Sequence, residues 1–193
     1  MKMKNLFYII LFLGIVNFSC NNNYTPKPYG YYRIDFPDKN YRLFDSIEFP
    51  YSFEYPTYGK IVIDADKNAE PYWINIEFKK YNCKLYLSYK PIKKDVSQFI
   101  EDAHTLAYKH SVKADAIEEK LIIDDNRKVY GLIYDIQGNA ASSFQFFTTD
   151  SIKNFLRGSL YFEAQPNKDS MATAITFFQK DVIHLIETLK WKK

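Results

Sequence analysis

Residues 45–89 alternate apolar and polar side chains with a period of two, which is the spacing of side chains along a β-strand. In the clearest run, Ile74 and Ile76 fall on one face of the predicted strand. Because proline has no backbone N–H to donate, Pro50 and Pro56 either restrict the first strand to a sheet edge or lie at the ends of that strand. We predict strands over residues 49–55, 61–63, 72–78 and 82–89.

The period then changes to that of a helix over residues 95–113. Asp95 is a candidate N-cap with Gln98 at the capping-box position. Lys109 and Lys113 stand near the C-terminal end, where the helix dipole favours cations. The positions that share the core-facing side of this helix are Val96, Phe99, Ile100, Ala103, Leu106, Ala107 and His110.

Strand spacing returns after this helix and is followed by a second amphipathic helix. Asp, Asn and Gly at 124–126 and 137–139 favour tight turns between the strands. The predicted strands cover residues 117–123, 128–136, 142–149 and 155–164, and the second helix covers residues 170–190.

The resulting order, ββββ-α-ββββ-α, predicts an α+β domain. Short connections favour antiparallel pairing of the strands, and the two amphipathic helices would cover the sheet. The order resembles the Mog1/PsbP-like α/β sandwich, in which a mostly antiparallel sheet lies between helices. Unrelated functions share that fold, so this resemblance concerns architecture alone. The aromatic content of 18% agrees with a sheet-rich protein.

The N-terminus has the features of a lipoprotein signal. Lys2 and Lys4 precede an apolar run over residues 6–16, which is too short for the roughly 20 residues of a membrane-spanning helix. Ser19 then stands directly before Cys20, where a lipobox places the acylated cysteine. We predict cleavage before an acylated Cys20. The alternative is an ordinary cleaved signal with an incidental cysteine, although no A-x-A site is present.

These features divide the chain into a signal peptide over residues 1–19, a lipidated tether and N-terminal segment over residues 20–44, and one globular domain over residues 45–193. The chain of 193 residues is long enough for one domain that needs no disulfide or metal ion. Once Cys20 is acylated, Cys83 is the remaining thiol. It alternates with apolar residues, so we predict that it lies in the core.

The charge balance argues against a nucleic-acid partner. The chain has 26 Lys and Arg against 23 Asp and Glu, and loss of Lys2 and Lys4 with the leader leaves 24 basic side chains. A net charge near +1 provides no long-range field that would hold a polyanion.

We find no residue cluster with the spacing of a metal or cofactor site. The best metal candidate is the D-x-D-x-N-x-E run at 64–70. It fails as a calcium loop because its sixth position holds Ala69 and its twelfth holds Asn75. Nucleophile-elbow, phosphate-loop, dinucleotide-binding and zinc-protease motifs are absent. We therefore expect no metal ion, no cofactor and no catalytic residue.

One polar patch provides an alternative hypothesis. Glu101, Asp102 and His104 cluster on one turn of the first predicted helix. In this hypothesis they form the polar centre of a domain that binds or hydrolyses cell-wall material. No Ser or Cys nucleophile is placed by the sequence to use this patch. We expect His110, on the apolar helix face, and His184, on the rim of the second helix, to be structural.

Short strings, distributed in order over the mature chain, carry a family resemblance. They include YTPKP, FPYSFEYP, FLRGSLYF and DVIHL, and they lie at residues 24–28, 30–31, 33–34, 49–56, 73–76, 87–92, 101–104, 108–110, 113–117, 138–142, 155–162, 166–170 and 181–185. Together they resemble the gliding-motility lipoprotein GldD family of Bacteroidetes.

The resemblance implies a non-enzymatic cell-envelope lipoprotein required for gliding, in bacteria where gliding is tied to type IX secretion. It implies a membrane partner, through acylated Cys20, and protein partners among the envelope components of the gliding and secretion apparatus. It transfers no catalytic residue to this chain. Because the tether lacks an acidic export cluster, we expect the domain to face the periplasm. We expect its anchor to lie in the outer membrane in preference to the inner membrane.

Overall fold

The computed structural model describes residues 34–93, 95–163 and 168–192. These residues belong to one compact unit that begins at Ile34, so the predicted domain start at Asp45 falls inside it. The predicted signal peptide, Cys20 and the first part of the tether lie outside the described residues.

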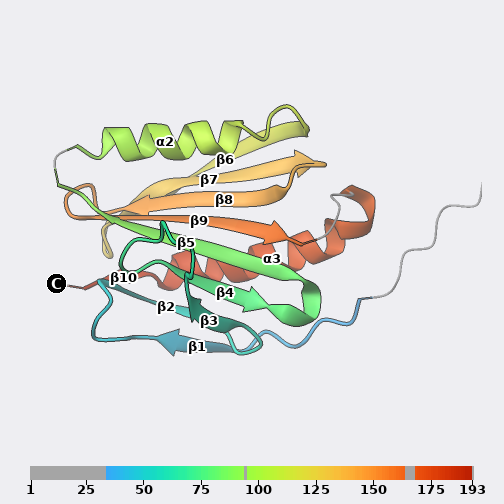
Figure 1. The fold of residues 1–193 in the computed structure, drawn as a ribbon, viewed down its shortest axis with the longest axis horizontal. Coiled ribbons are helices and arrows are strands. Elements are labelled where there is room, and N and C mark those ends of the chain that lie inside the picture. The colour runs from blue at the N-terminus through green and yellow to red at the C-terminus, as the bar shows by residue number, and fades with distance from the viewer. Residues whose placement is uncertain (1–33, 94, 164–167, 193) are drawn as a thin grey trace, which may run out of the picture. The chain divides into compact units, whose positions relative to one another are not determined.

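A seven-stranded antiparallel sheet forms the centre of this unit (Figure 1). Its strands are β3 (Lys60–Ile63), β4 (Ile74–Phe78), β5 (Cys83–Pro91), β6 (Ala114–Asp124), β7 (Val129–Gly138), β8 (Ser142–Thr149) and β9 (Asn154–Phe162). They are arranged in the order β3-β4-β5-β9-β8-β7-β6, and every pair is antiparallel, as predicted.

A small three-stranded sheet lies beside this large sheet. It consists of β1 (Tyr41–Phe44), β2 (Tyr51–Pro56) and β10 (Lys190–Trp191), with β2 in the middle. Only β2 was predicted from the alternation. Pro56 is the last residue of β2, a position at which a missing N–H costs little.

The two predicted helices are α2 (Ser97–Tyr108) and α3 (Lys168–Thr188), and a 3-10 turn, η1, spans Lys79–Tyr81. Ala103 and Ala107 of α2 pack with Phe147 on one face of the large sheet. Phe178 and Val182 of α3 pack into the core on the other face. The observed architecture is therefore the predicted α+β sandwich.

Two predicted boundaries are wrong in an informative way. The first helix ends at Tyr108, because a series of turn hydrogen bonds then leads the chain through Lys113 into β6. The predicted strand start at Tyr72 is also wrong, because its φ of 70° takes the backbone out of the extended region. The predicted N-cap at Asp95 is one residue early, because Val96 is the N-cap of α2; Asp95 Oδ1 nevertheless accepts the N–H of Ser97 at 2.9 Å.

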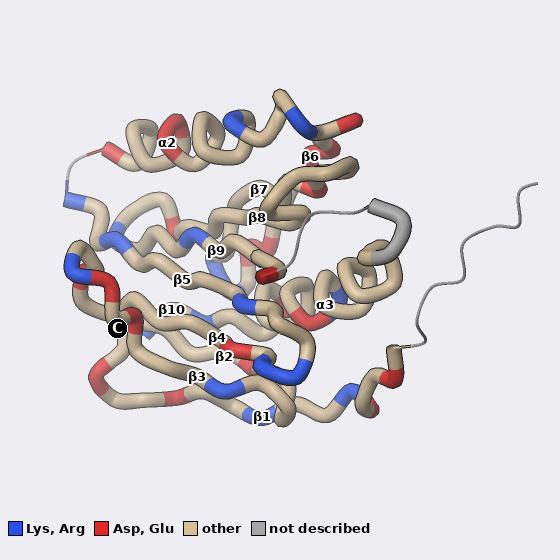
Figure 2. Tube along the Cα trace, turned by 45° about the vertical axis from the view of Figure 1, so that its right-hand side comes forward, with Lys and Arg blue, Asp and Glu red and all other residues tan. Residues whose placement is uncertain are grey.

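Charges of both signs are distributed over the helices and the sheet (Figure 2). This distribution agrees with the small net charge that the sequence gives the mature chain. Among the described residues, we find no helix that is both long enough and apolar enough to span a membrane.

Candidate functional site

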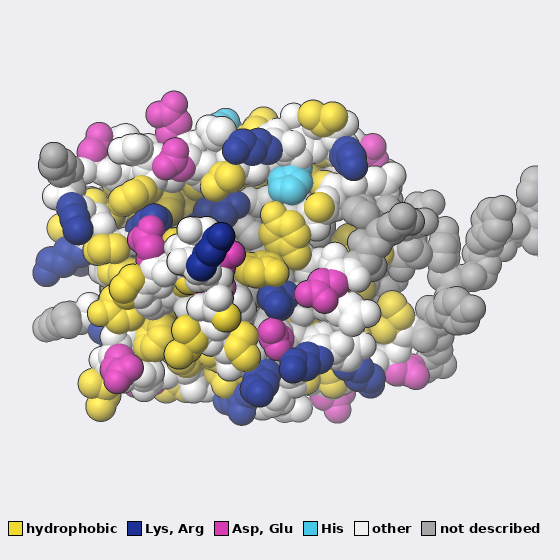
Figure 3. Space-filling view, viewed as in Figure 1, with side chains coloured by type: hydrophobic (Ala, Val, Ile, Leu, Met, Phe, Trp, Pro, Cys, Tyr) yellow, Lys and Arg dark blue, Asp and Glu magenta, His cyan; other side chains and the backbone are white. Residues whose placement is uncertain are grey.

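The two faces of the seven-stranded sheet are covered to different extents. On the α3 face, Leu85 of β5 and Leu160 of β9 are buried in the main core. On the α2 face, the apolar cluster under the helix takes residues from β7, β8 and β9, and none from β4 or β5. Figure 3 looks onto this partly open face, where hydrophobic, basic and histidine side chains meet below α2.

A row of side chains crosses the α2 face from one strand to the next. Its members are Cα partners in six neighbouring strands, and we call them the polar row: Asn75, Tyr86, Ser159, Gln145, Tyr134 and Glu119. Four of them carry a buried polar atom without a hydrogen-bond partner among the described residues: Asn75 Oδ1, Ser159 Oγ, Gln145 Nε2 and Tyr134 OH. Unpaired buried polar atoms are costly in a native protein, so the row marks a part of the sheet whose polarity the fold alone does not explain.

A groove opens over the part of the polar row that α2 leaves uncovered. Its volume of about 410 Å³ falls in the range of small-ligand sites, roughly 300–1,000 Å³. A smaller hollow continues the groove toward Phe99 and Asp102 of α2. The groove is lined by Asp64, Asp66, Trp73, Tyr86, Ser88, Arg157, Ser159 and Tyr161.

Arg157 provides the positive charge on the floor of the groove. Its Nη2 donates to Oε1 of Gln145 at 2.6 Å. The groove carboxylates of Asp64 and Asp66, and that of Asp102 in the neighbouring hollow, are all farther from it than the 4.0 Å of an ion pair. Burial lowers the pKa of Arg157, yet a guanidinium keeps its proton in proteins. The groove therefore contains a partly buried cation that no carboxylate of the described residues neutralises.

Aromatic rings form the walls of the groove. Trp73 is fixed by a 2.7 Å hydrogen bond from its Nε1 to the carbonyl oxygen of Tyr89. The rings of Tyr86 and Tyr161 pack edge to face, with centroids 5.6 Å apart and planes at 90°. Such fixed rings offer apolar surface to a ligand at a low entropic cost.

The alternative polar patch predicted from the sequence is solvent-exposed on α2, and its Asp102 borders the hollow that continues the groove. Glu101, Asp102 and His104 are all exposed, and no hydrogen bond or ion pair joins any two of them. His104 instead approaches the end of the polar row, with Nδ1 3.6 Å from Oε1 of Glu119. Hydrolysis of cell-wall material at this patch stays a prediction, and simultaneous replacement of the three residues by Ala is its test.

The remaining histidines are partly buried and contact other side chains. His184 Nε2 lies 2.8 Å from Oε2 of Glu54, and its ring stacks on Tyr41 at 3.7 Å. His110 follows α2 and packs edge to face near Tyr161. Burial, and then the charge of Arg157, lowers the pKa of His110.

A second charged group, which we call the Asp181 cluster, lies between α3 and the N-terminal segment. It contains Lys39, Tyr41, Tyr58 and Asp181, whose carboxylate is buried. Oδ1 of Asp181 lies 2.7 Å from Nζ of Lys39 and accepts the Tyr41 hydroxyl at 3.0 Å, and Oδ2 accepts the Tyr58 hydroxyl at 2.6 Å. Burial, together with the contact to Asp181, raises the pKa of both tyrosines. Each carboxylate oxygen has partners, so the cluster is a structural connection.

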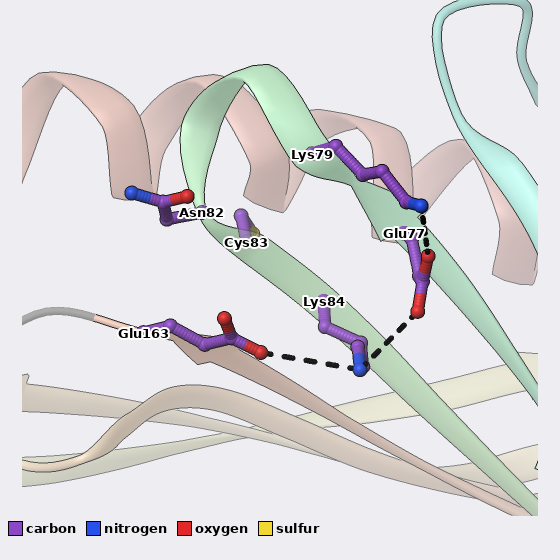
Figure 4. A pocket seen from close by; sticks show the side chains of 6 residues that line it. All are labelled: Glu77, Lys79, Asn82, Cys83, Lys84 and Glu163. Carbon is purple, nitrogen blue, oxygen red and sulfur yellow. Dashed lines mark ion pairs between the residues drawn. The ribbon is translucent and has the colours of Figure 1, made fainter. Parts of the chain in front are cut away.

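A smaller hollow at one end of β4 and β5 is lined by charges that are already paired (Figure 4). Nζ of Lys84 lies 3.3 Å from Glu77 and 3.9 Å from Glu163, and Nζ of Lys79 lies 3.7 Å from Glu77. Cys83 also borders this hollow, but its side chain is buried as predicted, and burial raises its pKa. Paired charges and an un-ionised thiol make this hollow a weaker candidate than the groove.

The predicted loop at 64–70 is a local turn in the structure. Oδ1 of Asp64 accepts the N–H of Asp66 at 3.0 Å, and Oδ1 of Asp66 accepts the N–H of Asn68 at 2.8 Å. Across the described ranges, no group of three or more His, Cys, Asp or Glu side chains could hold a metal ion.

Sequence analysis missed the polar row, Arg157 and the Asp181 cluster. A signal for Arg157 was present, because Arg157 and Ser159 occupy one face of a strand whose other face is apolar at Leu156 and Leu160. The position of that strand in the middle of the sheet, which makes the pattern unusual, is known only from the structure.

Comparison with solved structures supports the fold. The chain is similar to the solution structure of cyanobacterial PsbP (CyanoP) from Synechocystis sp. PCC 6803, with a TM-score of 0.50 and 15% sequence identity over 86% of this chain and 99% of that chain. At this identity the similarity concerns the fold alone, and it confirms the PsbP-like sandwich.

Comparison at the level of sequence identifies the family. No curated protein matches the chain at a significant level. A protein-family comparison, in contrast, matches residues 21–191 to the gliding motility lipoprotein GldD. This match spans nearly the whole chain after the predicted cleavage site, including the groove and the Asp181 cluster. The chain therefore belongs to the gliding motility lipoprotein GldD family, whose members are membrane-anchored envelope proteins.

Proposed function

We propose that the protein is a non-enzymatic component of the gliding and type IX secretion apparatus that docks on another envelope protein. In this proposal, acylated Cys20 anchors it in the outer membrane and the domain faces the periplasm. The observation that carries the docking role is the outer edge of β6, which pairs with no further strand of the described residues and to which we assign an extended segment of the partner protein.

Strand β6 is a long edge strand. It has 11 residues and ends the strand order, whereas β3, at the opposite edge, has four. An edge strand presents a row of unpaired N–H and C=O groups, and native proteins usually keep such edges short or cover them. An edge twice the typical strand length of about 5–6 residues supports a role in pairing with another chain.

The side chains of β6 favour an apolar, extended partner. Leu121 and Ile123 are 75% and 68% exposed and occupy the same face of the strand. Glu118, Glu119 and Lys120 precede them, and charges at such positions suppress unselective pairing of edges. A partner segment with alternating apolar residues would pair with the backbone of β6 and cover Leu121 and Ile123.

Support for the anchor comes from the sequence. The lipobox ends at Cys20, and the family is one of lipoproteins. The stretch directly after Cys20 contains no acidic residue before Asp35, which argues against export to the cell surface. An anchored domain of this kind meets its partners in two dimensions, where a single strand addition is sufficient for stable association.

Cross-linking in living cells tests this proposal. The tagged, acylated protein would be cross-linked and purified, and the recovered proteins identified by mass spectrometry. We expect gliding or type IX secretion proteins, and we expect the double variant Leu121→Lys/Ile123→Lys to recover them at about a tenth of the yield or less, because charged residues block strand addition.

Two controls make the result specific. Ile47→Lys makes the same kind of substitution, with one added positive charge, at a side chain that is 98% exposed in the loop between β1 and β2, and we expect unchanged recovery. Cys20→Ala removes the anchor and should abolish recovery. Equal recovery by the β6 double variant and by Ile47→Lys would refute docking at this edge, and recovery of no envelope protein at all would refute the assembly role.

A further inference from the structure

We infer that the groove binds an acidic saccharide, with the carboxylate of the sugar on Arg157 and its ring against the aromatic walls. The groove lies over β4, β5 and β9, and β6 forms the far edge of the sheet. This inference is therefore independent of docking at β6.

The first argument concerns charge. A guanidinium presents a planar fork of N–H donors that matches the two oxygens of a carboxylate. In Arg157 one nitrogen, Nη2, is used by Gln145, and no carboxylate of the described residues pairs with the group. A partly buried cation left without a counter-ion is costly. An arriving carboxylate would remove that cost, so the charge selects an anion.

The second argument concerns the unpaired atoms beside Arg157. Ser159 lines the groove and is 3% exposed, and its Oγ has no partner among the described residues. Gln145 is 1% exposed; its Oε1 holds Arg157, and its Nε2 is unpaired. Both side chains stand next to Arg157 in the sheet register, in β9 and β8. Ser159 lines the groove, so a ligand with a hydroxyl group next to its carboxylate would lie against this residue, while Gln145 lies outside the lining and holds Arg157 in place.

The third argument distinguishes a sugar from a peptide carboxylate. Trp73, Tyr86 and Tyr161 provide ring surfaces, on which the apolar face of a sugar can pack. At the mouth of the groove, Asp64 and Asp66 provide carboxylate oxygens that accept hydrogen bonds and repel a second anion. A ligand with one carboxylate and several hydroxyl donors fits both ends of the groove. A peptide C-terminus has the carboxylate but lacks the hydroxyls.

Calorimetric titration of the acylated full chain in detergent tests this inference with a matched pair of probes. These are a β-1,4-linked glucose trimer in which one terminal residue is replaced by glucuronic acid, here called the uronate trimer, and cellotriose, the neutral trimer with the same linkage. We expect the uronate trimer to bind at least about tenfold more tightly, since a buried charge-assisted pair is worth at least one decade of affinity. Triglycine, which carries a carboxylate and no hydroxyls, should bind no better than cellotriose.

Variants locate the site. Arg157→Gln should weaken binding of the uronate trimer by about tenfold or more, and Arg157→Lys, which keeps the charge and loses the fork, by less. Trp73→Ala should weaken the uronate trimer and cellotriose equally, since it removes only ring contact. Lys79→Gln is the matched control, because that lysine lies 3.7 Å from Glu77 and is not part of the groove lining; it should leave binding unchanged. Thermal melting confirms that each variant is folded.

Three results would overturn the inference. The first is no binding of the uronate trimer at concentrations up to about 10 mM. The second is equal binding of the uronate trimer and cellotriose. The third is binding of triglycine as tight as that of the uronate trimer. If Arg157→Gln fails to fold, Arg157→Lys and Trp73→Ala still decide the site, and unchanged binding in both would exclude the groove.

Discussion

Two charged side chains of the described residues differ in how well they are paired: Asp181, which is buried on the α3 side of the sheet, and Arg157, which is partly buried on the α2 side. Asp181 meets a lysine and two tyrosine hydroxyls, so both of its carboxylate oxygens are occupied. Arg157 meets only one side-chain amide oxygen and lies beside unpaired atoms of Ser159 and Gln145. The two charges therefore contribute in opposite directions to the free energy of unfolding.

This difference separates a connection within the fold from a place left open for binding. Removal of one partner of a fully paired buried ion strongly destabilises a protein. A poorly paired buried ion, in contrast, can be replaced by an apolar residue without loss of stability. Binding sites are commonly built from groups of the second kind, which are less stable in the free protein and gain their partners from the ligand.

Removal of the Asp181 carboxylate should have the largest effect. We expect Asp181→Ala to lower the free energy of unfolding by about 3 kcal/mol, because Lys39, Tyr41 and Tyr58 would lose their common acceptor. This is the lower end of the usual range, since the Lys39 side chain is 27% exposed and water can reach it. Urea denaturation measures the change.

Asp181→Asn is the control for shape at this position. The amide keeps one acceptor for the tyrosines and removes the charge. We therefore expect Asp181→Asn to lower the free energy of unfolding by less than Asp181→Ala does. If Asp181→Ala costs less than about 1 kcal/mol, the cluster is no stronger than an exposed ion pair and the comparison with Arg157 fails.

Alkaline pH should weaken the same cluster. Because the folded pKa values of Tyr41 and Tyr58 are raised, their contribution to stability is complete below the unfolded value of about 10 and is lost as pH rises above it. A tyrosine that is protonated in the folded state and ionised in the unfolded state lowers the free energy of unfolding by at most about 1.4 kcal/mol for each unit of increasing pH. The lowered pKa of Lys39 acts in the opposite direction.

Urea midpoints at pH 8, 9, 10 and 11 would test this dependence. We expect Tyr58→Phe to have a shallower decline above pH 10 than the wild type. Tyr130→Phe, at a hydroxyl that bonds Asp125 on the surface, should leave the decline nearly as steep. Parallel curves for the wild type and Tyr58→Phe would show that this hydroxyl does not couple folding to pH.

Replacement of the groove arginine should have a smaller effect of opposite sign. We expect Arg157→Met to raise the free energy of unfolding by about 1 kcal/mol, because an unpaired cation leaves a site where a methionine side chain can pack. Arg127→Met is the matched control. Arg127 pairs with Asp124 and donates to the carbonyl oxygens of Ile186 and Leu189, so its loss should cost about 1–2 kcal/mol. Destabilisation of the same size in both variants would contradict the comparison.

Two buried serines make the smallest and most closely matched test. Ser142 Oγ donates to the carbonyl oxygen of Leu160 at 2.9 Å, whereas Ser159 Oγ has no partner among the described residues. We expect Ser142→Ala to lose about 1 kcal/mol and Ser159→Ala to gain about 0.5 kcal/mol. Thermal melting of both variants at pH 7 measures the difference, and a loss of equal size would mean that the Ser159 hydroxyl is satisfied in solution.

Much of the fold followed from local periodicity in the sequence. The alternation that predicted β4 and β5 and the helical spacing that predicted α3 are properties of neighbouring residues. Strands β1 and β10 were missed because they have four and two residues and form only by pairing with β2. The end of the first helix was misplaced for a similar reason, since tertiary pairing of β6 sets where that helix ends.

The candidate site depends on information that no local pattern contains. The polar row exists only because β5 pairs with β9 and β9 with β8, which brings Tyr86 beside Ser159 and Ser159 beside Gln145. Tyr41 and Asp181 meet across 140 positions of sequence. Glu101, Asp102 and His104 were grouped because they are neighbours in sequence, while in the structure Asp102 borders the hollow beside the groove and His104 approaches Glu119.

The position of Lys39 in the Asp181 cluster has a mechanical consequence. A protein held to a membrane near its N-terminus receives any pulling force through the chain that leads from the anchor. If Cys20 is the anchor, as proposed, the load reaches Lys39 and Tyr41 before it reaches the large sheet, and their contacts with Asp181 pass it to α3, the longest helix described. Traction would then act on a helix that is packed along the core, and the strands that carry the groove would be shielded from strain.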